Sequence, residues 1–294
     1  MTTVIENDFL KAKIKHDGAE LCSLINKTTG KELIWQADPK VWRRHAPILF
    51  PFVGRMKDDQ YTHEGKTYKM GQHGFARDRQ FDVKSASAEK VLFTLTADEE
   101  SLKIYPFAFE LRVQYALEEK KLVIGYQVVN TDQKEILFSI GAHPGFNVPL
   151  NEGEHFNDHS LCFEQEEQLD RHMLAENGLF DGRVDMGYLS GKRHLTLNFD
   201  KFDEDALVFE DYQSAHVDLV NLKEKTALLR FHFKNFPYLG IWTKPKAHAN
   251  YICIEPWFGI ADYTSGNEEL ADKAGIQRLP EGHSFGCQYA VEIP

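Results

Sequence analysis

Short segments with an apolar residue at about every second position recur along the chain. Residues 107–115 show this alternation most clearly, and residues 122–129 and 227–233 repeat it in part. Residues 91–96 and 251–254 are rich in the apolar and β-branched side chains that are typical of strands. Because the side chains of a strand alternate between two faces, this spacing predicts strands and not helices.

Turn-forming residues separate many of these segments, for example at residues 26–30 and 62–66. Helical spacing is rare, and its best candidates are residues 164–176 and 267–274, both of which are short. The polar segment 151–170 fits either a domain boundary or a long loop.

Many short strands in a chain of 294 residues predict an all-β fold, a large antiparallel β-sandwich with few short helices. No linker rich in Pro, Ser or Gly and no short-period repeat interrupts the sequence. We therefore expect a single domain over residues 1–294.

The composition of the chain indicates the class of protein and the partners that it disfavours. The chain is 42% hydrophobic and 27% charged, which is ordinary for a soluble globular protein. Aromatic residues make up 12%, which favours strands and a cleft with aromatic walls. The formal net charge of −11 argues against nucleic acid and anionic membrane surfaces as main partners.

The chain start and the cysteines suggest a compartment. No basic region followed by an apolar stretch begins the sequence, and no run of about 18 apolar residues occurs in it. The four cysteines are scattered and form no CxxC pair, which fits free thiols in a reducing environment. We expect a cytoplasmic protein with no membrane span.

Three distant segments carry side chains that are capable of proton transfer. They are residues 72–77, 141–147 and 253–257, and each places its histidine or glutamate beside Gly, Pro or an aromatic residue. Imidazole exchanges a proton near neutral pH and a carboxylate accepts one. Gly and Pro indicate backbone held in defined turns, and aromatic neighbours such as Trp257 provide flat apolar walls that stack on sugar rings.

Glu255 and His143 are the strongest acid/base candidates. Glu255 follows an apolar strand and precedes Pro256 and Trp257, a buried setting that raises the pKa of a carboxyl. The plainer interpretation is a glutamate that caps a loop or pairs with an arginine. His143 follows a strand-like segment and precedes a Pro-Gly turn, where it is either held at the mouth of a cleft or packed as a turn histidine.

Three more residues are candidates for substrate contacts. Arg55 follows Gly54 at the end of an apolar segment, and an arginine there donates a fork of hydrogen bonds to vicinal hydroxyls or to a phosphate. His73 and Arg77 share one motif. Taken alone, each of the three fits a structural histidine or a surface arginine equally simply.

Several chemistries are excluded by missing motifs. The sequence has no HExxH motif, no close cluster of His and Cys ligands, no GxSxG elbow, no Walker A loop and no GxGxxG after a strand. We expect no dedicated metal site and no nucleotide cofactor. The acidic run 203–205 fits a cation site or, more simply, a charged loop.

Taken together, these segments resemble the aldose 1-epimerase (galactose mutarotase-like) family, and within it the LacX-like branch associated with lactose operons. The resemblance spans nearly the whole chain, and its most specific parts are residues 73–77, 143–146 and 255–257 in this order. It implies a large β-sandwich with a sugar cleft on one face, and interconversion of the α and β anomers of an aldohexose without metal or cofactor.

The resemblance also implies roles for individual residues. Glu255 matches the general base that acts on the C1 hydroxyl, His143 the general acid at the ring oxygen, and His73 the second histidine beside that oxygen. Arg55 or Arg77 would bind hydroxyls. A substrate-binding aspartate falls at Asp205, with Asp203 and Asp211 as close rivals. Glu255 is expected to be ionised and His143 protonated at working pH.

Two other functions stay open at this point. Relatives that act on hexose 6-phosphates carry a similar His-Gly-x-x-Arg segment, so Arg55 and Arg77 could hold a phosphate instead of hydroxyls. A non-catalytic carbohydrate-binding protein of the same fold is the other alternative. The sequence leaves open which aldose is used and what the oligomeric state is.

Overall fold

The computed structural model describes all residues from 1 to 294 and consists mainly of antiparallel strands. A four-stranded sheet at the start of the chain pairs its strands in sequence order. Its members are β1 (Thr2–Glu6), β2 (Leu10–Lys15), β3 (Leu21–Asn26) and β4 (Lys31–Glu32).

The second sheet has 15 strands and forms most of the molecule. Along its main path the order is β5 (Ile48–Leu49), β13 (Ile140–Ala142), β21 (Tyr251–Phe258), β20 (Tyr238–Trp242), β17 (Leu207–Glu210), β15 (His159–Leu174), β18 (His216–Asn221), β19 (Thr226–His232), β23 (Ser284–Glu292), β11 (Lys121–Asn130), β10 (Phe109–Glu118), β9 (Lys90–Thr96) and β8 (Asp82–Ala86). Two strands lie off this path, β14 (Gly145–Asn147) beside β21 and β16 (Phe180–Thr196) beside β15.

Two small two-stranded sheets and a few short helices complete the fold. One is a hairpin of β6 (Gln60–His63) and β7 (Lys66–Lys69), and the other is a two-stranded sheet that pairs β12 (Ile136–Phe138) with the distant β22 (Gln277–Leu279). The single α-helix is α1 (Glu99–Ile104), and five 3-10 helices span Lys57–Asp59, Ala76–Asp78, Phe156–Asp158, Phe199–Phe202 and Leu270–Asp272. None of the helices has the length and apolar character that crossing a membrane requires.

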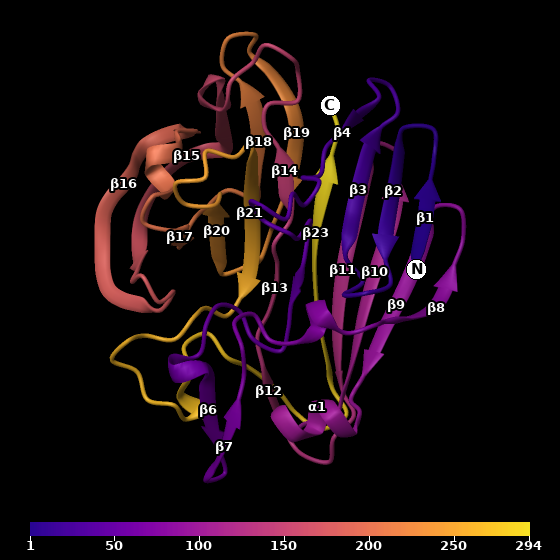
Figure 1. Cartoon of the computed structure of the whole chain (residues 1–294), viewed down its shortest axis with the longest axis vertical. Coiled ribbons are helices and arrows are strands. Elements are labelled where there is room, and N and C mark those ends of the chain that lie inside the picture. Colours follow the sequence, from indigo (N-terminus) through magenta and orange to yellow (C-terminus); the bar gives the residue numbers. More distant parts are fainter.

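In Figure 1, β15, β16, β17 and β20 lie on the left, β1 to β3 and β8 to β11 lie on the right, and β13, β14, β18, β19 and β21 lie between them. One apolar cluster of 64 buried residues extends from Ile5 to Ile293. The sequence prediction of a large antiparallel β-sandwich is therefore confirmed, and this continuous core supports the proposal that residues 1–294 form one domain.

The predicted strands are found where the alternation placed them, but the helix predictions are wrong. Residues 164–174 belong to β15, where Leu169, Arg171 and Met173 are buried and alternate with more exposed neighbours. The helix-forming side chains of this segment are overridden by pairing with β16 and β17. Only the first part of the polar segment 151–170 is a loop. Residues 267–274 contain one 3-10 turn and no α-helix.

Helix α1 was not expected from apolar spacing, yet its start carries a local signal. The Asp98 side chain accepts a hydrogen bond from the backbone N–H of Ser101, and the Ser101 hydroxyl accepts one from the backbone N–H of Asp98. This reciprocal capping satisfies two backbone donors that a helix start leaves free.

The indole of Trp257 lies over two glycines on the strands that flank β21. A Cβ on Gly141 of β13 would lie 2.5 Å from Trp257 Cδ1, and a Cβ on Gly240 of β20 would lie 2.4 Å from Cη2. Both distances are shorter than carbon atoms tolerate. The missing side chains therefore make the space that this large ring occupies.

Gly240→Ala should lower the free energy of unfolding by about 1–3 kcal/mol, because the added methyl forces the Trp257 ring out of a packed position. Urea denaturation measures the change, and tryptophan fluorescence of the native state reports the ring. Gly125→Ala is the matched control, since a Cβ at that strand position meets nothing within 4 Å. Equal midpoints for the two variants would contradict this account.

Candidate active site

A cavity of about 430 Å³ lies on the face of β13, β21, β20 and β17 that points away from the main core. On these strands, Ile254 and Ile241 point into the core, whereas Glu255, Trp257 and Trp242 line the cavity. Because strand side chains alternate between two faces, one face of β21 packs against the core and the other lines the cavity. The end of the β15–β16 hairpin and the segments around residues 41–42, 53–54 and 72–77 form the remaining walls.

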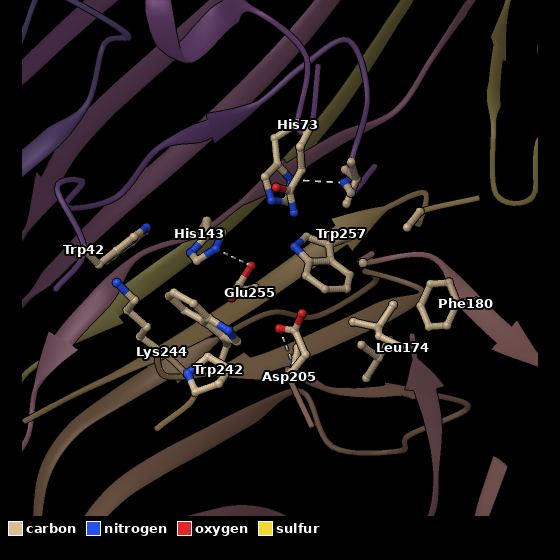
Figure 2. A pocket seen from close by; sticks show the side chains of 18 of the residues that line it. Trp42, His73, His143, Leu174, Phe180, Asp205, Trp242, Lys244, Glu255 and Trp257 are labelled. Carbon is tan, nitrogen blue, oxygen red and sulfur yellow. Dashed lines mark hydrogen bonds and ion pairs between the residues drawn. The ribbon is translucent and has the colours of Figure 1, made fainter. Parts of the chain in front are cut away.

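His143 lies at the break between two short strands that both pair with β21. Gly141 of β13 pairs with Trp257, and Gly145 of β14 pairs with Cys253, so the turn between them is opposite Glu255. The imidazole Nε2 of His143 is 3.3 Å from Oε2 of Glu255 (Figure 2). The structure therefore brings together the two strongest acid/base candidates of the sequence.

Burial pushes both members of this pair toward their uncharged forms. The pKa of Glu255 is raised well above its ordinary value by burial and by the nearby carboxylate of Asp205. The pKa of His143 is lowered to about 3 by burial and by the charge of Arg77. This differs from the ion pair expected from the sequence, because no cation close to Glu255 offsets the loss of water.

His73 is held in one tautomer by the backbone. The N–H of Gly54 donates to Nδ1 of His73 at 3.0 Å, so the proton of the neutral ring must be on Nε2. Burial, followed by the charges of Arg77 and His143, lowers the pKa of His73 well below its ordinary value. The ring lies 5.7 Å from that of His143, centroid to centroid, and presents a neutral N–H donor to the cavity.

The turn around His73 is rigid for steric reasons. His73 has a φ of 67°, and its N–H donates to the carbonyl of Gly54 at 2.8 Å. The next residue, Gly74, has a φ of 68°, and a Cβ there would lie 2.3 Å from the carbonyl oxygen of Phe50. Only glycine fits this position.

Asp205 is the aspartate that the fold places at the cavity. It has a φ of 75°, its Oδ1 accepts from the N–H of Ala206 at 2.9 Å, and burial raises its pKa. Of its two rivals, Asp203 lines only an adjoining surface depression and Asp211 is exposed outside the cavity. Trp257 lies nearby, and its indole nitrogen is buried without a hydrogen-bond partner.

The two arginines predicted as substrate contacts separate in the structure. Arg77 lines the cavity, its Nη2 donates to the carbonyl of Gln72 at 2.6 Å, and burial lowers its pKa to about 10. Arg55 is not among the lining residues. Its half-exposed guanidinium lies 3.8 Å from Asp59, because the turn at Gly54 (φ 73°) directs the chain away from the cavity.

The sequence predicted aromatic walls but did not identify Trp42 and Trp242 as parts of them. The Trp42 ring is stacked on that of His143, with ring centroids 4.9 Å apart, and the Trp242 ring meets the His143 ring edge-on at 5.4 Å. Trp42 lies in an irregular loop and is also stacked on Tyr251. The sequence carries no local signal for these contacts, because the rings that meet belong to segments that are far apart in the chain.

Lys244 is a second missed residue of the cavity. Its ammonium donates to the carbonyl of Val41 at 2.7 Å, so it ties the Trp42 loop to the end of β20. Cys253 does not line the cavity, but it is fully buried on the same face of β21 as Glu255. Donor atoms of His143, Cys253 and Glu255 all lie within 4.8 Å of one another, a cluster that no close spacing in the sequence announces.

The sequence of this chain matches one known protein family. Residues 1–266 match the family model described as aldose 1-epimerase. The chain belongs to the aldose 1-epimerase family. Within this family, the chromosomal LacX protein of Lactococcus lactis subsp. lactis is 33% identical over 286 residues, which are 95% of each chain.

Solved structures of relatives have the same fold. A galactose mutarotase related enzyme from Lactobacillus acidophilus gives a TM-score of 0.94 at 36% identity, over 100% of this chain and 97% of that one. A galactose mutarotase-like protein from Lactobacillus casei gives 0.93 at 35% identity, over 100% of both. The galactose mutarotase-like fold and the LacX-like resemblance inferred from the sequence are confirmed.

Glu255→Gln should stabilise this aldose 1-epimerase family member more at pH 8 than at pH 5. The carboxyl pKa is higher in the folded than in the unfolded protein, so its stabilising contribution is full below about pH 4.5 and is lost as the pH rises toward the folded value. Each pH unit crossed between the two values removes about 1.4 kcal/mol, whereas glutamine does not titrate. Urea denaturation at both pH values measures the difference.

Glu20 provides a control of opposite sign. Burial alone would raise its pKa, but hydrogen bonds from His45 and the charge of Lys15 outweigh burial and lower the pKa to about 2. Its contribution is present above about pH 4.5 and is lost as the pH falls toward 2. Glu20→Gln should therefore destabilise the protein at pH 7 and less so at pH 3. A pH-independent effect of Glu255→Gln would contradict the assignment.

Proposed function

We propose that this protein is an aldose 1-epimerase that interconverts the α and β anomers of a free aldohexose such as galactose or glucose. The observation that carries the proposal is the pair formed by His143 and Glu255, 3.3 Å apart on the wall of a cavity of about 430 Å³. A carboxyl and an imidazole at this separation are the acid and base that ring opening needs.

Proton transfer at two oxygens opens and closes the sugar ring. Glu255 takes the proton of the C1 hydroxyl while His143 gives one to the ring oxygen, and the C1–O5 bond breaks. Rotation of the aldehyde end and the reverse transfers then close the ring on its other face. Both groups must lie within about 3 Å of the oxygen that they serve.

One proton shared by the pair is sufficient for this cycle. A neutral carboxyl beside a neutral imidazole holds the same number of protons as a carboxylate beside an imidazolium. A proton that moves from Glu255 to His143 converts the resting pair into the reactive one without exchange with water. Sugar hydroxyls that donate to the carboxylate favour this second form.

The other walls suit a hexose ring. The neutral N–H of His73 and the free indole N–H of Trp257 are donors for ring or hydroxyl oxygens, and the carboxylate of Asp205 is an acceptor for hydroxyl protons. Trp42 and Trp242 add flat apolar surface beside His143. This combination of apolar walls with few polar groups is typical of small-ligand sites.

A hexose 6-phosphate is the second candidate substrate. The side chains of Arg77 and Lys244 both line the cavity: Arg77 donates to the carbonyl of Gln72 and lies 3.8 Å from the exposed Asp78, and Lys244 donates to the carbonyl of Val41. Two cations on the wall of one cavity also fit a phosphate. A non-catalytic sugar-binding protein would need neither His143 nor Glu255 in this arrangement.

Glu255→Gln and His143→Ala should each slow anomer exchange by at least about 100-fold, since each removes one proton-transfer group. Polarimetry or NMR of the anomeric protons on fresh α-galactose, α-glucose and glucose 6-phosphate measures the rate. Glu166→Gln and His283→Ala, which change exposed residues, serve as matched controls. Near-normal rates in either active-site variant would refute the assigned roles, and sugar binding without faster exchange in the wild type would favour the binding protein.

Arg77→Gln distinguishes the two substrates. If a phosphate is bound, the variant should raise the KM for glucose 6-phosphate by about tenfold or more, because hydrogen bonds to charged groups contribute about 1.5–3 kcal/mol. The KM for galactose should then stay within about twofold of the wild-type value. If the substrate is a free aldose, as we propose, KM for both sugars should change alike. Arg55→Gln, outside the cavity, is the matched control.

A further inference from the structure

Three different metal-binding donors meet at the edge of the cavity, where His143 and Glu255 line it and the fully buried Cys253 lies next to them. Atoms of His143, Cys253 and Glu255 lie within 4.8 Å of one another, and all three side chains are buried. Cys253 and Glu255 are two residues apart on one face of β21, and His143 faces them from the β13–β14 turn. The thiol of Cys253 has no part in the proposed proton transfers.

The donor set matches one class of ion. Imidazole nitrogen, thiolate sulfur and carboxylate oxygen together are typical ligands of Zn²⁺, at about 2.0–2.3 Å from the ion. Ligand atoms around such a tetrahedral ion are about 3.3–3.8 Å apart, so small side-chain rotations would close the present cluster. Mg²⁺ and Ca²⁺ prefer oxygen ligands and do not fit this set.

Charge also favours a divalent ion at this position. A bound ion would displace one proton from the thiol and one from the carboxyl, and both protons would go to solvent. The resulting thiolate and carboxylate balance the 2+ charge, so the buried complex carries no net charge. In addition, Nδ1 of His143 is buried without a hydrogen-bond partner, so metal binding would break no hydrogen bond of that atom.

We propose that one zinc-like divalent cation binds to His143, Cys253 and Glu255 and inhibits the protein by occupying its proton-transfer pair. His143 and Glu255 line the cavity, so the ion enters by the route that the sugar uses, and its fourth position faces the cavity. Inhibition rests on the proposed function, but binding of the ion does not.

Titration of the chelator-treated full chain with Co²⁺ tests binding, because a thiolate ligand gives cobalt an additional charge-transfer absorption band. We expect one Co²⁺ per chain, a band that Zn²⁺ removes by competition, and loss of the band in Cys253→Ala. His143→Ala should weaken binding by more than about tenfold, since the loss of even an outer-shell partner costs about 10- to 100-fold. Cys253→Val serves if the alanine variant does not fold.

Cys162 provides the matched control. Its Sγ lies 3.6 Å from Nε2 of His194 on the β15–β16 hairpin, the other thiol–imidazole contact in the chain. Cys162→Ala should leave the band unchanged. A band that disappears in Cys162→Ala, that persists in Cys253→Ala, or that never forms would each overturn the proposal.

Anomer exchange gives the second measurement. Zn²⁺ should slow the wild type and leave Cys253→Ala unaffected, whereas Mg²⁺ should affect neither. A wild type that shows no exchange before any metal is added would contradict the proposed function alone, and the cobalt titration would still decide the metal site. Equal inhibition of the wild type and Cys253→Ala by Zn²⁺ would overturn the inhibitory site.

Discussion

Pairing of β21 with neighbours on both sides is the constraint on which the rest of the site depends. On one side β20 pairs with it in continuous register, and on the other side two short strands pair with its two halves. These two short strands share one register, since Gly141 pairs with Trp257 and Gly145 with Cys253, and this register places His143 directly opposite Glu255. Because the side chains of opposite residues in an antiparallel pair lie on the same face, the pairing of β21 is what brings an acid and a base together.

The charges around Glu255 are the second feature on which the site depends. Glu255 is almost fully buried, its nearest charged neighbour is another acidic residue, and the closest cations lie at the rim. The molecule bears an unfavourable carboxyl at the floor of its cavity, and the stability lost there is compensated by the large apolar core on the opposite face of the same strands. A buried group that costs stability and lines a cavity is typical of a functional site.

How much of the structure could be predicted from the sequence depends on how far apart in the chain the interacting residues lie. Strand alternation is a local property, so the all-β fold could be predicted, and so could Glu255 and His143, because each lies at a strand end marked by Gly, Pro or an aromatic residue. Stacking of Trp42 on His143 and the cluster around Cys253 depend on packing between distant segments and were missed. Arg55 lies outside the cavity because Gly54 has a positive φ. This backbone conformation could not be predicted from the sequence alone.

Trp257 and its two flanking glycines restrict how this cavity can change during evolution. While the indole is present, neither Gly141 nor Gly240 can gain a side chain, because a single added carbon would overlap the ring. A smaller residue at position 257 would release both glycines at once and deepen the floor beside Glu255. Mutational routes toward bulkier substrates therefore have a fixed order, in which the tryptophan changes first and the glycines follow.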